Sequence, residues 1–448
     1  MEKVQHKDKE LRYFCLFSAV LLFGVALLFD SPKGILEGFI TIVCSRDVLI
    51  TDYFELAGYG AALFNAGLML LFAMGLIKIT KLPYTGITLS AIFINVGFAL
   101  WGKNPINIIP IVFGIWCYAK LHRMHFARVV YTALFATCLS PLVSELVYIL
   151  PFSKEKNLII AIVIGILAGF ILPPLAMHTA SMHMGYNLFN VGFAAGTVLF
   201  VIYSVLRSMG IESEPVFLWR VEKSMGLVQG AFAYFVITFL YGLWLAGGNI
   251  SGLRKIAKHP GRAVADFVMM DGAGTTLMNM GLMGIVAELY VLFVEGDISG
   301  PALGGIIVVY AFAAFGAHIR NYLPVLAGVY LSTWFSVYEP NSPSILIASM
   351  FVVGISPIAG EFGVIPGILA GMMHSAVVTC TAQFYGGLNL YNNGFAGGFV
   401  AIVMVPLVES GMKRFELRRY EKEQKLNLKK AMHLDQMLHL EKHKDSKE

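Results

Sequence analysis

The sequence predicts an all-α membrane protein, a polytopic helical bundle built from two related halves. Of the 448 residues, 57% are hydrophobic and only 14% are charged, whereas soluble domains carry about 25% charged residues. Apolar stretches long enough to cross about 30 Å of hydrocarbon recur from Phe14 to Leu407. The net charge of +5 does not indicate nucleic-acid binding, because the basic residues concentrate in loops and tail. We therefore expect the lipid bilayer as a partner and a multi-pass protein of the cell membrane.

The first element is a charged N-terminus that leads into a long apolar stretch. Asp30 and Pro32 follow that stretch, and it lacks the small-residue cleavage site of a secretory signal. We interpret residues 1–30 as an uncleaved N-terminal helix.

The rest of the chain to residue 411 is a tandem duplication. Residues 51–68, TDYFELAGYGAALFNAGL, align with residues 265–282, ADFVMMDGAGTTLMNMGL, at an offset of 214. Residues 167–196 align without a gap with residues 369–398, at an offset of 202. Because several blocks repeat in one order, we divide the chain into repeat 1 (31–224), repeat 2 (225–411) and a charged, helical, cytoplasmic tail (412–448).

The two repeats predict about 14 membrane segments, some of which could be re-entrant. We place them at 11–30, 57–78, 85–101, 105–121, 128–150, 157–178, 183–206, 226–246, 273–294, 300–315, 320–338, 344–358, 361–380 and 384–411. The stretches 34–50 and 248–264 correspond to each other, and we expect interfacial helices there, because the first is short of a full span. If it crosses the membrane, the number of crossings per half changes.

The basic residues predict the orientation of these segments. The N-terminus, residues 119–128, residues 253–262 and the tail are strongly basic, so all four should be cytoplasmic, and both termini with them. Seven crossings per half is an odd number, which would place the second copy upside down relative to the first. Such inverted-topology repeats are typical of many transporters and channels.

Matched asparagines are the main candidates for a binding site. Polar groups in hydrocarbon are costly unless they face protein or water. The functional interpretation is a midplane site lined by amides, and the alternative is hydrogen bonding between Gly-rich helices. The candidate substrate-binding residues are Asn65, Asn190, Asn279, Asn392, Asn187, Asn389, Asn107 and Asn321.

Two glutamates and a histidine are candidates for proton or cation coupling. Glu145 and Glu361 follow matched Ser-Pro pairs, where a proline frees a helix carbonyl. The alternative is a carboxylate that caps a helix at the membrane surface. His178 lies beside the second duplicated block, as do His183 and His374, but their spacing does not match H-E-x-x-H. We therefore expect no metal site and no cofactor.

The segment GKNPINIIP at 102–110 resembles a helix start, with Asn104 as N-cap and Pro105 as the first helical residue. A helix N-terminus beside Lys103, or beside Arg320 in the second copy, would suit an anion. The alternative, basic residues that anchor a helix at the interface, is favoured.

The duplicated pattern resembles a family of bacterial integral membrane proteins that is classified only as a domain of unknown function. The resemblance covers nearly the whole chain to residue 411 and implies no substrate. The segment GAALFNAG, residues 60–67, resembles more loosely an element of urea channels, which also have inverted halves. The Leu-Pro-x-x-Thr-x-Pro-Phe signature of those channels is missing, and GKNPINIIPIVFG stands near its place.

Together these features predict a transporter or channel for a small neutral or zwitterionic solute, with a site between the inverted repeats and with proton or cation coupling through the glutamates. A urea-like amide or a small anion is the alternative substrate class, and a homo-oligomer is compatible with this fold. The competing function is a membrane-embedded enzyme that uses His178, His183, His374 and a glutamate. We do not expect the protein to be an enzyme. The GxxxxGK[ST] motif of ATP-hydrolysing proteins does not occur in the sequence.

Overall fold

The computed structural model describes residues 2–222 and 224–414, and the predicted tail beyond residue 414 lies outside them. Within this part of the chain every regular element is a helix, which confirms the predicted all-α class, and the β-type pairing is limited to isolated bridges. Residues 1–402 form one compact unit, and residue 403 begins a second. The description below concerns the first unit, apart from the helix that leads out of it.

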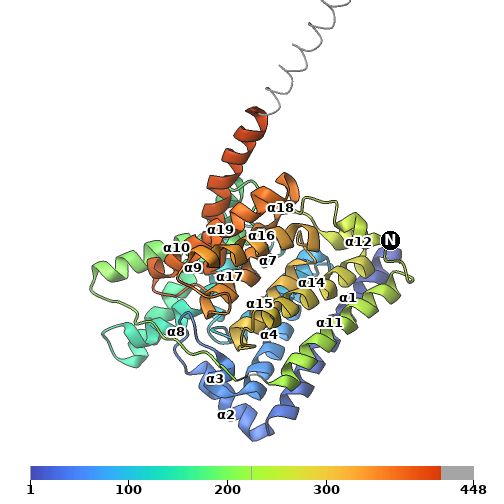
Figure 1. Ribbon diagram of the computed structural model, residues 1–448. Helices are drawn as coiled ribbons and strands as arrows, with labels where there is room; N and C mark the ends of the chain where they lie inside the picture. The colour runs from blue at the N-terminus through green and yellow to red at the C-terminus, as the bar shows by residue number, and fades with distance from the viewer. Residues whose placement is uncertain (1, 223, 415–448) are drawn as a thin grey trace, which may run out of the picture. The chain divides into compact units, whose positions relative to one another are not determined.

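The first half contains short and long helices, most of which are labelled in Figure 1. They are α1 (Glu2–Phe29), α2 (Pro32–Val43), α3 (Tyr53–Ala57), α4 (Tyr59–Thr80), α5 (Gly86–Phe98), α6 (Ile109–Leu121), η1 (Phe126–Arg128), α7 (Val130–Ala136), η2 (Thr137–Leu139), α8 (Ser140–Ile149), α9 (Lys154–Met182) and α10 (Asn190–Ser208).

The second half repeats this order. Its helices are α11 (Met225–Leu245), α12 (Ser251–Ile256), α13 (Phe267–Asp271), α14 (Ala273–Phe293), α15 (Gly300–Phe312), α16 (Ile319–Ser332), η3 (Thr333–Phe335), α17 (Pro343–Phe351), η4 (Val352–Ile355), α18 (Ser356–Phe362), α19 (Val364–Thr381), η5 (Ala382–Tyr385) and a last helix, Asn392–Arg414.

Ten of the helical segments in the described part are long and apolar enough to cross a membrane. The fourteen predicted segments all contain helix, but four are short: α5, α6, α15 and α16 have 13 or 14 residues each. The count of about 14 spans is therefore not confirmed. The interfacial stretches are represented by α2 and α12.

Interruptions divide the helices at matched places in the two halves. The segment 99–108 separates α5 from α6 and the segment 313–318 separates α15 from α16, with Gly102 and Gly316 at φ of +78° and +95°. The regular part of α6 begins at Ile109, later than the predicted start at Pro105. Turns of 3₁₀ helix, η2 and η4, interrupt the spans 130–149 and 343–362.

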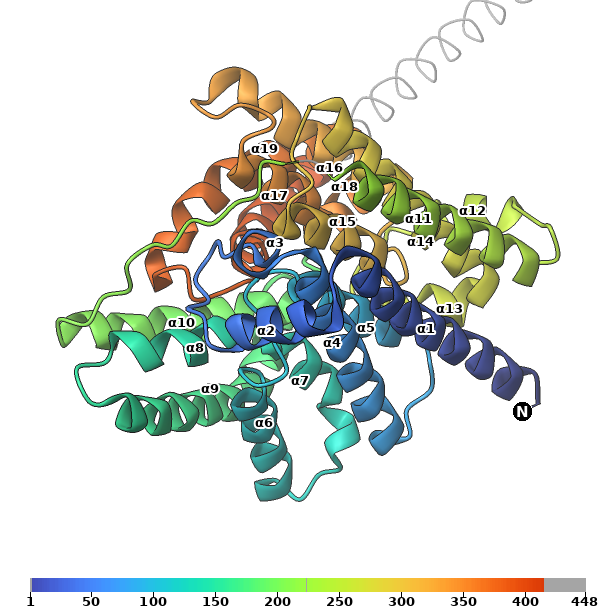
Figure 2. The same cartoon turned by 90° about the horizontal axis from the view of Figure 1, so that it is seen from below.

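The two halves meet through α5 and α15. Most of the first half fills the lower part of Figure 2 and most of the second half the upper part. The hydroxyl of Ser90 on α5 donates to the carbonyl of Ala311 on α15 (2.7 Å). At the matched positions, Gly97 and Gly304 approach so closely that a Cβ on either one would meet the carbonyl oxygen of the other. Such reciprocal contacts are the signature of a two-fold relation between two copies.

Candidate functional site

Two aspartates each cap a helix of the opposite half. The N–H of Gly300, at the start of α15, donates to Oδ1 of Asp52 (3.0 Å). At the matched position, the N–H of Gly86, at the start of α5, donates to Oδ1 of Asp266 (2.8 Å). The approach is tight enough that a Cβ at Gly300 or Gly86 would overlap the aspartate oxygen. A carboxylate at a helix N-terminus is favourable because it meets free N–H groups and the positive end of the helix dipole.

The 3₁₀ interruptions are held in the same reciprocal way. The N–H of Leu390, in the loop before the last helix, donates to the carbonyl of Cys138 in η2 (3.2 Å). The N–H of Leu188, in the loop before α10, donates to the carbonyl of Gly354 in η4 (2.8 Å). A helix interruption leaves backbone carbonyls without intrahelical partners. Each half therefore supplies the N–H group that pairs a freed carbonyl of the other half.

Aromatic rings fill the space between these interruptions. The ring of Phe98 lies 4.9 Å from that of Tyr391, and the matched ring of Phe312 lies 4.7 Å from that of Phe189. Phe189 and Tyr391 lie 5.0 Å apart. We call these four residues, together with Trp101 and Phe351, the central aromatic cluster.

The candidates Asn65 and Asn279 hold the ends of the short helices. The amide nitrogen of Asn65 donates to the carbonyls of Ala99 and Lys103, both at 2.7 Å. The amide nitrogen of Asn279 donates to the matched carbonyls of Ala313 and Ala317, at 2.7 and 2.9 Å. These carbonyls lie at and just beyond the C-terminal ends of α5 and α15, where helix carbonyls have no intrahelical partner.

Asn190 and Asn392 hold the turns that precede α10 and the last helix. Their amide nitrogens donate to the carbonyls of Ala176 (2.8 Å) and Val378 (3.1 Å). Each amide oxygen accepts from a threonine 11 residues earlier, Thr179 or Thr381 (both 2.8 Å).

At each of these turns the amide oxygen is also contacted by a histidine or tyrosine side chain. Nε2 of His183 lies 2.9 Å from Oδ1 of Asn190, and the hydroxyl of Tyr385 donates to Asn392 at the matched position.

The remaining asparagines contact backbone groups, and Asn107 also donates to the side chains of Asp47 and Ser144 (both 3.0 Å). Asn107 and Asn321 accept through Oδ1 from the N–H of Asn104 (3.0 Å) and of His318 (2.9 Å), and so close capping turns before α6 and α16. Asn187 donates to the carbonyl of Gly394 in the other half (2.9 Å). Its counterpart Asn389 has a buried amide nitrogen without a hydrogen-bond partner among the described residues. Seven of the eight amide nitrogens are thus paired within the protein, most of them with backbone carbonyls.

A buried lysine lies beside the central aromatic cluster. Lys103, in the interruption between α5 and α6, is 1% exposed. Its ammonium group donates to Oδ1 of Asn95 (3.0 Å) and lies 4.9 Å from the ring centre of Phe98. No carboxylate within the described residues forms an ion pair with it. The matched position in repeat 2 is Ala317, so this charge is present in one half only.

Several buried polar atoms in the interrupted segments have no hydrogen-bond partner among the described residues. They are Trp101 Nε1, Asn104 Nδ2, Asn389 Nδ2, Tyr391 Oη and Ser356 Oγ. Trp101 and Tyr391 each contact Phe98, whose ring also faces the Lys103 ammonium. Buried polar groups are normally paired, and groups that are not paired require an explanation. The indole nitrogen of Trp101 and the amide nitrogens of Asn104 and Asn389 can only donate, and they are suited to a ligand that offers hydrogen-bond acceptors.

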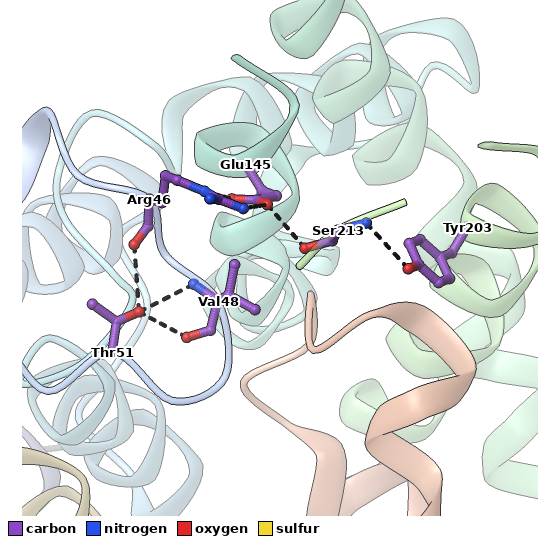
Figure 3. A network of polar contacts seen from close by, with 6 residues as sticks. All are labelled: Arg46, Val48, Thr51, Glu145, Tyr203 and Ser213. Atoms are coloured by element: carbon purple, nitrogen blue, oxygen red, sulfur yellow. Dashed lines mark hydrogen bonds and ion pairs between the residues drawn. The ribbon is translucent and has the colours of Figure 1, made fainter. Parts of the chain in front are cut away.

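Glu145, a candidate for proton or cation coupling, is held in an ion pair. Figure 3 shows its carboxylate facing the guanidinium of Arg46, with Nε–Oε2 at 3.0 Å and Nη2–Oε1 at 2.5 Å. The hydroxyl of Ser213 also donates to Oε1 (2.9 Å), and the N–H of Ser213 donates to the hydroxyl of Tyr203. The side chain of Glu145 is fully buried, whereas Glu361 at the matched position is exposed.

A second buried carboxylate lies next to this ion pair, in the connection between α2 and α4. Asp47 is fully buried and accepts from Tyr53 (2.7 Å), Ser144 (2.7 Å) and Asn107 (3.0 Å). Burial raises the pKa of Asp47 to about 6, and the hydrogen bonds oppose that rise. Burial likewise raises the pKa of Asp52 to about 6. Sequence reasoning did not single out Asp47, because it has no acidic counterpart in the second copy.

The histidines do not converge on one site. His178 is exposed on α9, and His183 and His374 each lie against an asparagine oxygen, of Asn190 (2.9 Å) and Asn393 (3.0 Å). Among the described residues no three His, Cys, Asp or Glu side chains are grouped as metal ligands.

Glu288, inside α14, is buried, and both its oxygens lack a partner in the described part of the chain. The signal for it was an acidic residue within the apolar segment AELYVLF.

A cavity of about 310 Å³ lies between α1, α11, α5 and α15. Its lining is apolar apart from a hydroxyl group of Ser18, Tyr234 and Tyr310. This lining does not offer the hydrogen bonds that a polar solute requires.

Comparison with known proteins gives a family but no activity. No curated protein and no solved structure matches the chain, so the likeness to urea channels rests on the sequence segment alone. The model of one family matches residues 31–208 and 246–410, one region within each predicted repeat, and these residues make up more than half of the chain. This match confirms the predicted membership of a duplicated family without an assigned function: the chain belongs to the family described as "Protein of unknown function (DUF1576)".

Proposed function

We propose that the protein is a membrane transporter or channel for a small polar solute, built from two inverted repeats, and not an enzyme. The observation that carries this proposal is the set of matched helix interruptions, which surrounds unpartnered polar atoms and a buried lysine. In membrane proteins, non-helical backbone at depth is tolerated where it is buried in protein or lines a pathway. Interrupted helices near the interface of repeats are a recurrent form of transporter binding site.

The contacts between the halves support inversion. Asp52 lies just before α4, while its partner Gly300 lies just after the end of α14. Asp266 lies just before α14, while its partner Gly86 lies just after the end of α4. Each long helix therefore begins where its counterpart ends. If both cross the bilayer, they cross it in opposite directions.

The basic loops support the same arrangement. Five of the ten candidate spans fall in each half, and we propose that the short pairs α5–α6 and α15–α16 each enter and leave on one side. With the N-terminus inside, residues 119–128, residues 253–262 and the C-terminal tail are then all cytoplasmic. An odd number of crossings per half again inverts the second copy.

The polar atoms near the central aromatic cluster favour a solute with acceptor groups. Trp101 Nε1, Asn389 Nδ2 and the ammonium of Lys103 can only donate hydrogen bonds. The carboxylate of a zwitterionic solute or a neutral carbonyl group would pair with them. The apolar cavity beside Tyr234 is a less suitable place for such a solute.

Uptake by proteoliposomes tests this proposal. The full chain is reconstituted and assayed with a panel of radiolabelled small solutes: amino acids, urea, small carboxylates and polyols. We expect saturable flux of at least one carbonyl-containing or zwitterionic solute, and loss of that flux in Lys103→Met. Absence of flux for the whole panel, or full flux in the variant, would contradict the proposed site.

A further inference from the structure

The two repeats differ at the N-terminus of the long helix that follows the interfacial segment, which is α4 in repeat 1 and α14 in repeat 2. In repeat 1, the N–H of Gly60 in the first turn of α4 donates to Oδ2 of Asp30 (3.0 Å). Asp30 follows the last residue of α1. The carboxylate thus occupies the place where free N–H groups and the helix dipole attract an anion.

Repeat 2 lacks this carboxylate. The close contact of Gly60 with the carbonyl of Ala26 is matched by that of Gly274 with the carbonyl of Gly242, an offset of 216 between α1 and α11. The same offset relates Asp30 to Ala246. The first turn of α14 therefore lies against Ala246, which carries no carboxylate, where the first turn of α4 lies against Asp30.

A pocket of about 380 Å³ lies at this position. Ala246, Gly274 and Thr275 line it, together with Lys255 from the connection between α11 and α14. Thr275 is only 8% exposed, and its hydroxyl makes no hydrogen bond among the described residues. The pocket thus combines an unpartnered hydroxyl on a buried residue, the first turn of α14 and a lysine.

Two carboxylates also line the pocket. That of Asp271 is 3.1 Å from Nε2 of His259, which pairs with it, and Glu10 comes from the N-terminal part of α1. These charges disfavour an anion, whereas Lys255 and the helix dipole favour it. The equivalent turn in repeat 1 already holds an anionic oxygen, that of Asp30.

We infer that the pocket between Ala246, Thr275 and Lys255 binds a phosphate group, in the place that Asp30 fills in the other repeat. The group comes either from a free phosphate compound or from an anionic lipid headgroup. The basic connection 253–262 is predicted to be cytoplasmic, so the site would face the cytoplasm and sense an anion there. This inference does not depend on the transported solute.

Calorimetric titration of the full chain in a maltoside detergent tests the inference. In one arm the probe is inorganic phosphate. In the other arm it is dioleoyl phosphatidylglycerol added to the micelles, with dioleoyl glycerol as the phosphate-free comparison. Saturable binding in the first arm identifies a free-anion site, and binding of the phospholipid alone identifies a headgroup site. Absence of binding in both arms overturns the inference.

Variants locate the bound group. Ala246→Asp restores the carboxylate of repeat 1 and is expected to weaken binding at least tenfold. Lys255→Ala is expected to weaken it several-fold, while Lys258→Ala, an exposed lysine of the same connection that does not line the pocket, leaves it unchanged. Equal binding by wild type and Ala246→Asp would overturn the assignment, provided that both proteins show the same melting temperature without ligand.

Discussion

The carboxylate of Asp266 accepts the N–H of Gly86, a residue 180 positions away in the other repeat, at 2.8 Å. The same carboxylate accepts from the N–H of Ile87 (3.1 Å), so it pairs two of the first N–H groups of α5. Asp52 and Gly300 form the equivalent bond in the opposite direction. These two caps join the repeats at both ends of the α5–α15 contact.

Removal of either cap should destabilise the fold. Asp266→Ala leaves the N–H groups of Gly86 and Ile87 without their acceptor, and we expect a loss of about 1–3 kcal/mol in the free energy of unfolding. Asp52→Ala should cost a similar amount because its geometry is equivalent. The melting temperature of the purified protein in detergent measures both. Glu37→Gln, at an exposed residue of α2, serves as the control. Wild-type melting in both aspartate variants would show that the caps do not join the halves.

The Arg46–Glu145 pair offers a comparison within the chain. Glu145→Gln weakens a bidentate ion pair whose carboxylate is fully buried, and we expect a loss of about 1–3 kcal/mol, because the Arg46 guanidinium would lose its charged partner. Glu361→Gln changes the matched but exposed glutamate and should leave stability within about 0.5 kcal/mol of wild type. Thermal unfolding distinguishes the two. Equal losses would contradict the different environments of these residues.

The hydrogen bonds of Asn65 and Asn279 should slow hydrogen exchange in the interruptions that they hold. Asn65→Leu leaves the carbonyls of Ala99 and Lys103 without their donor, and we expect a loss of about 1–3 kcal/mol. Hydrogen exchange in residues 99–108 should accelerate before exchange elsewhere. Asn279→Leu should do the same for residues 313–318. The control is Ser204→Ala, which removes an exposed hydroxyl. Unchanged exchange in both segments would leave the amides free for another role.

Lys103→Met separates transport from stability. Removal of a buried ammonium without a carboxylate partner relieves a desolvation cost, so the melting temperature should stay equal or rise. Asn95 retains the hydrogen bond from Thr137 to its amide oxygen (2.9 Å). Flux of the identified solute should fall at least tenfold, while Lys156→Met, at an exposed lysine, should transport normally. Normal flux in the Lys103 variant would remove the lysine from the site.

Self-similarity in the sequence predicts the duplication and the matched asparagines, because a gene duplication leaves aligned residues that need no structure to detect. The long apolar stretches predict the helical class. Self-similarity could not predict the partners of those asparagines, since most are backbone carbonyls of interrupted helices, and a carbonyl carries no sequence signal. Asp47 and Glu288 were missed because each is charged in one repeat only and is replaced in the other by Gly261 or Met74. Lys103 was noted as a residue that would suit an anion, but its burial could not be predicted, and Ala317 stands at the matched position.

The length of the short helices was also beyond prediction. The apolar stretches around α5 and α15 continue past the helix ends at Phe98 and Phe312 into the interruptions. Hydropathy therefore counts them as spans, because it does not register that Gly102 and Gly316 turn the chain with positive φ.

Inversion of the two repeats is the central claim, and one labelling measurement tests it most directly. Lys81 and Glu295 occupy matched positions after α4 and α14, both exposed and both at φ of +56°. In a variant without the native cysteines, Lys81→Cys and Glu295→Cys are treated separately with a membrane-impermeant maleimide on intact cells. We expect Glu295→Cys to react at once and Lys81→Cys to react only after the membrane is permeabilised. Reaction of both from the same side would contradict the inverted arrangement.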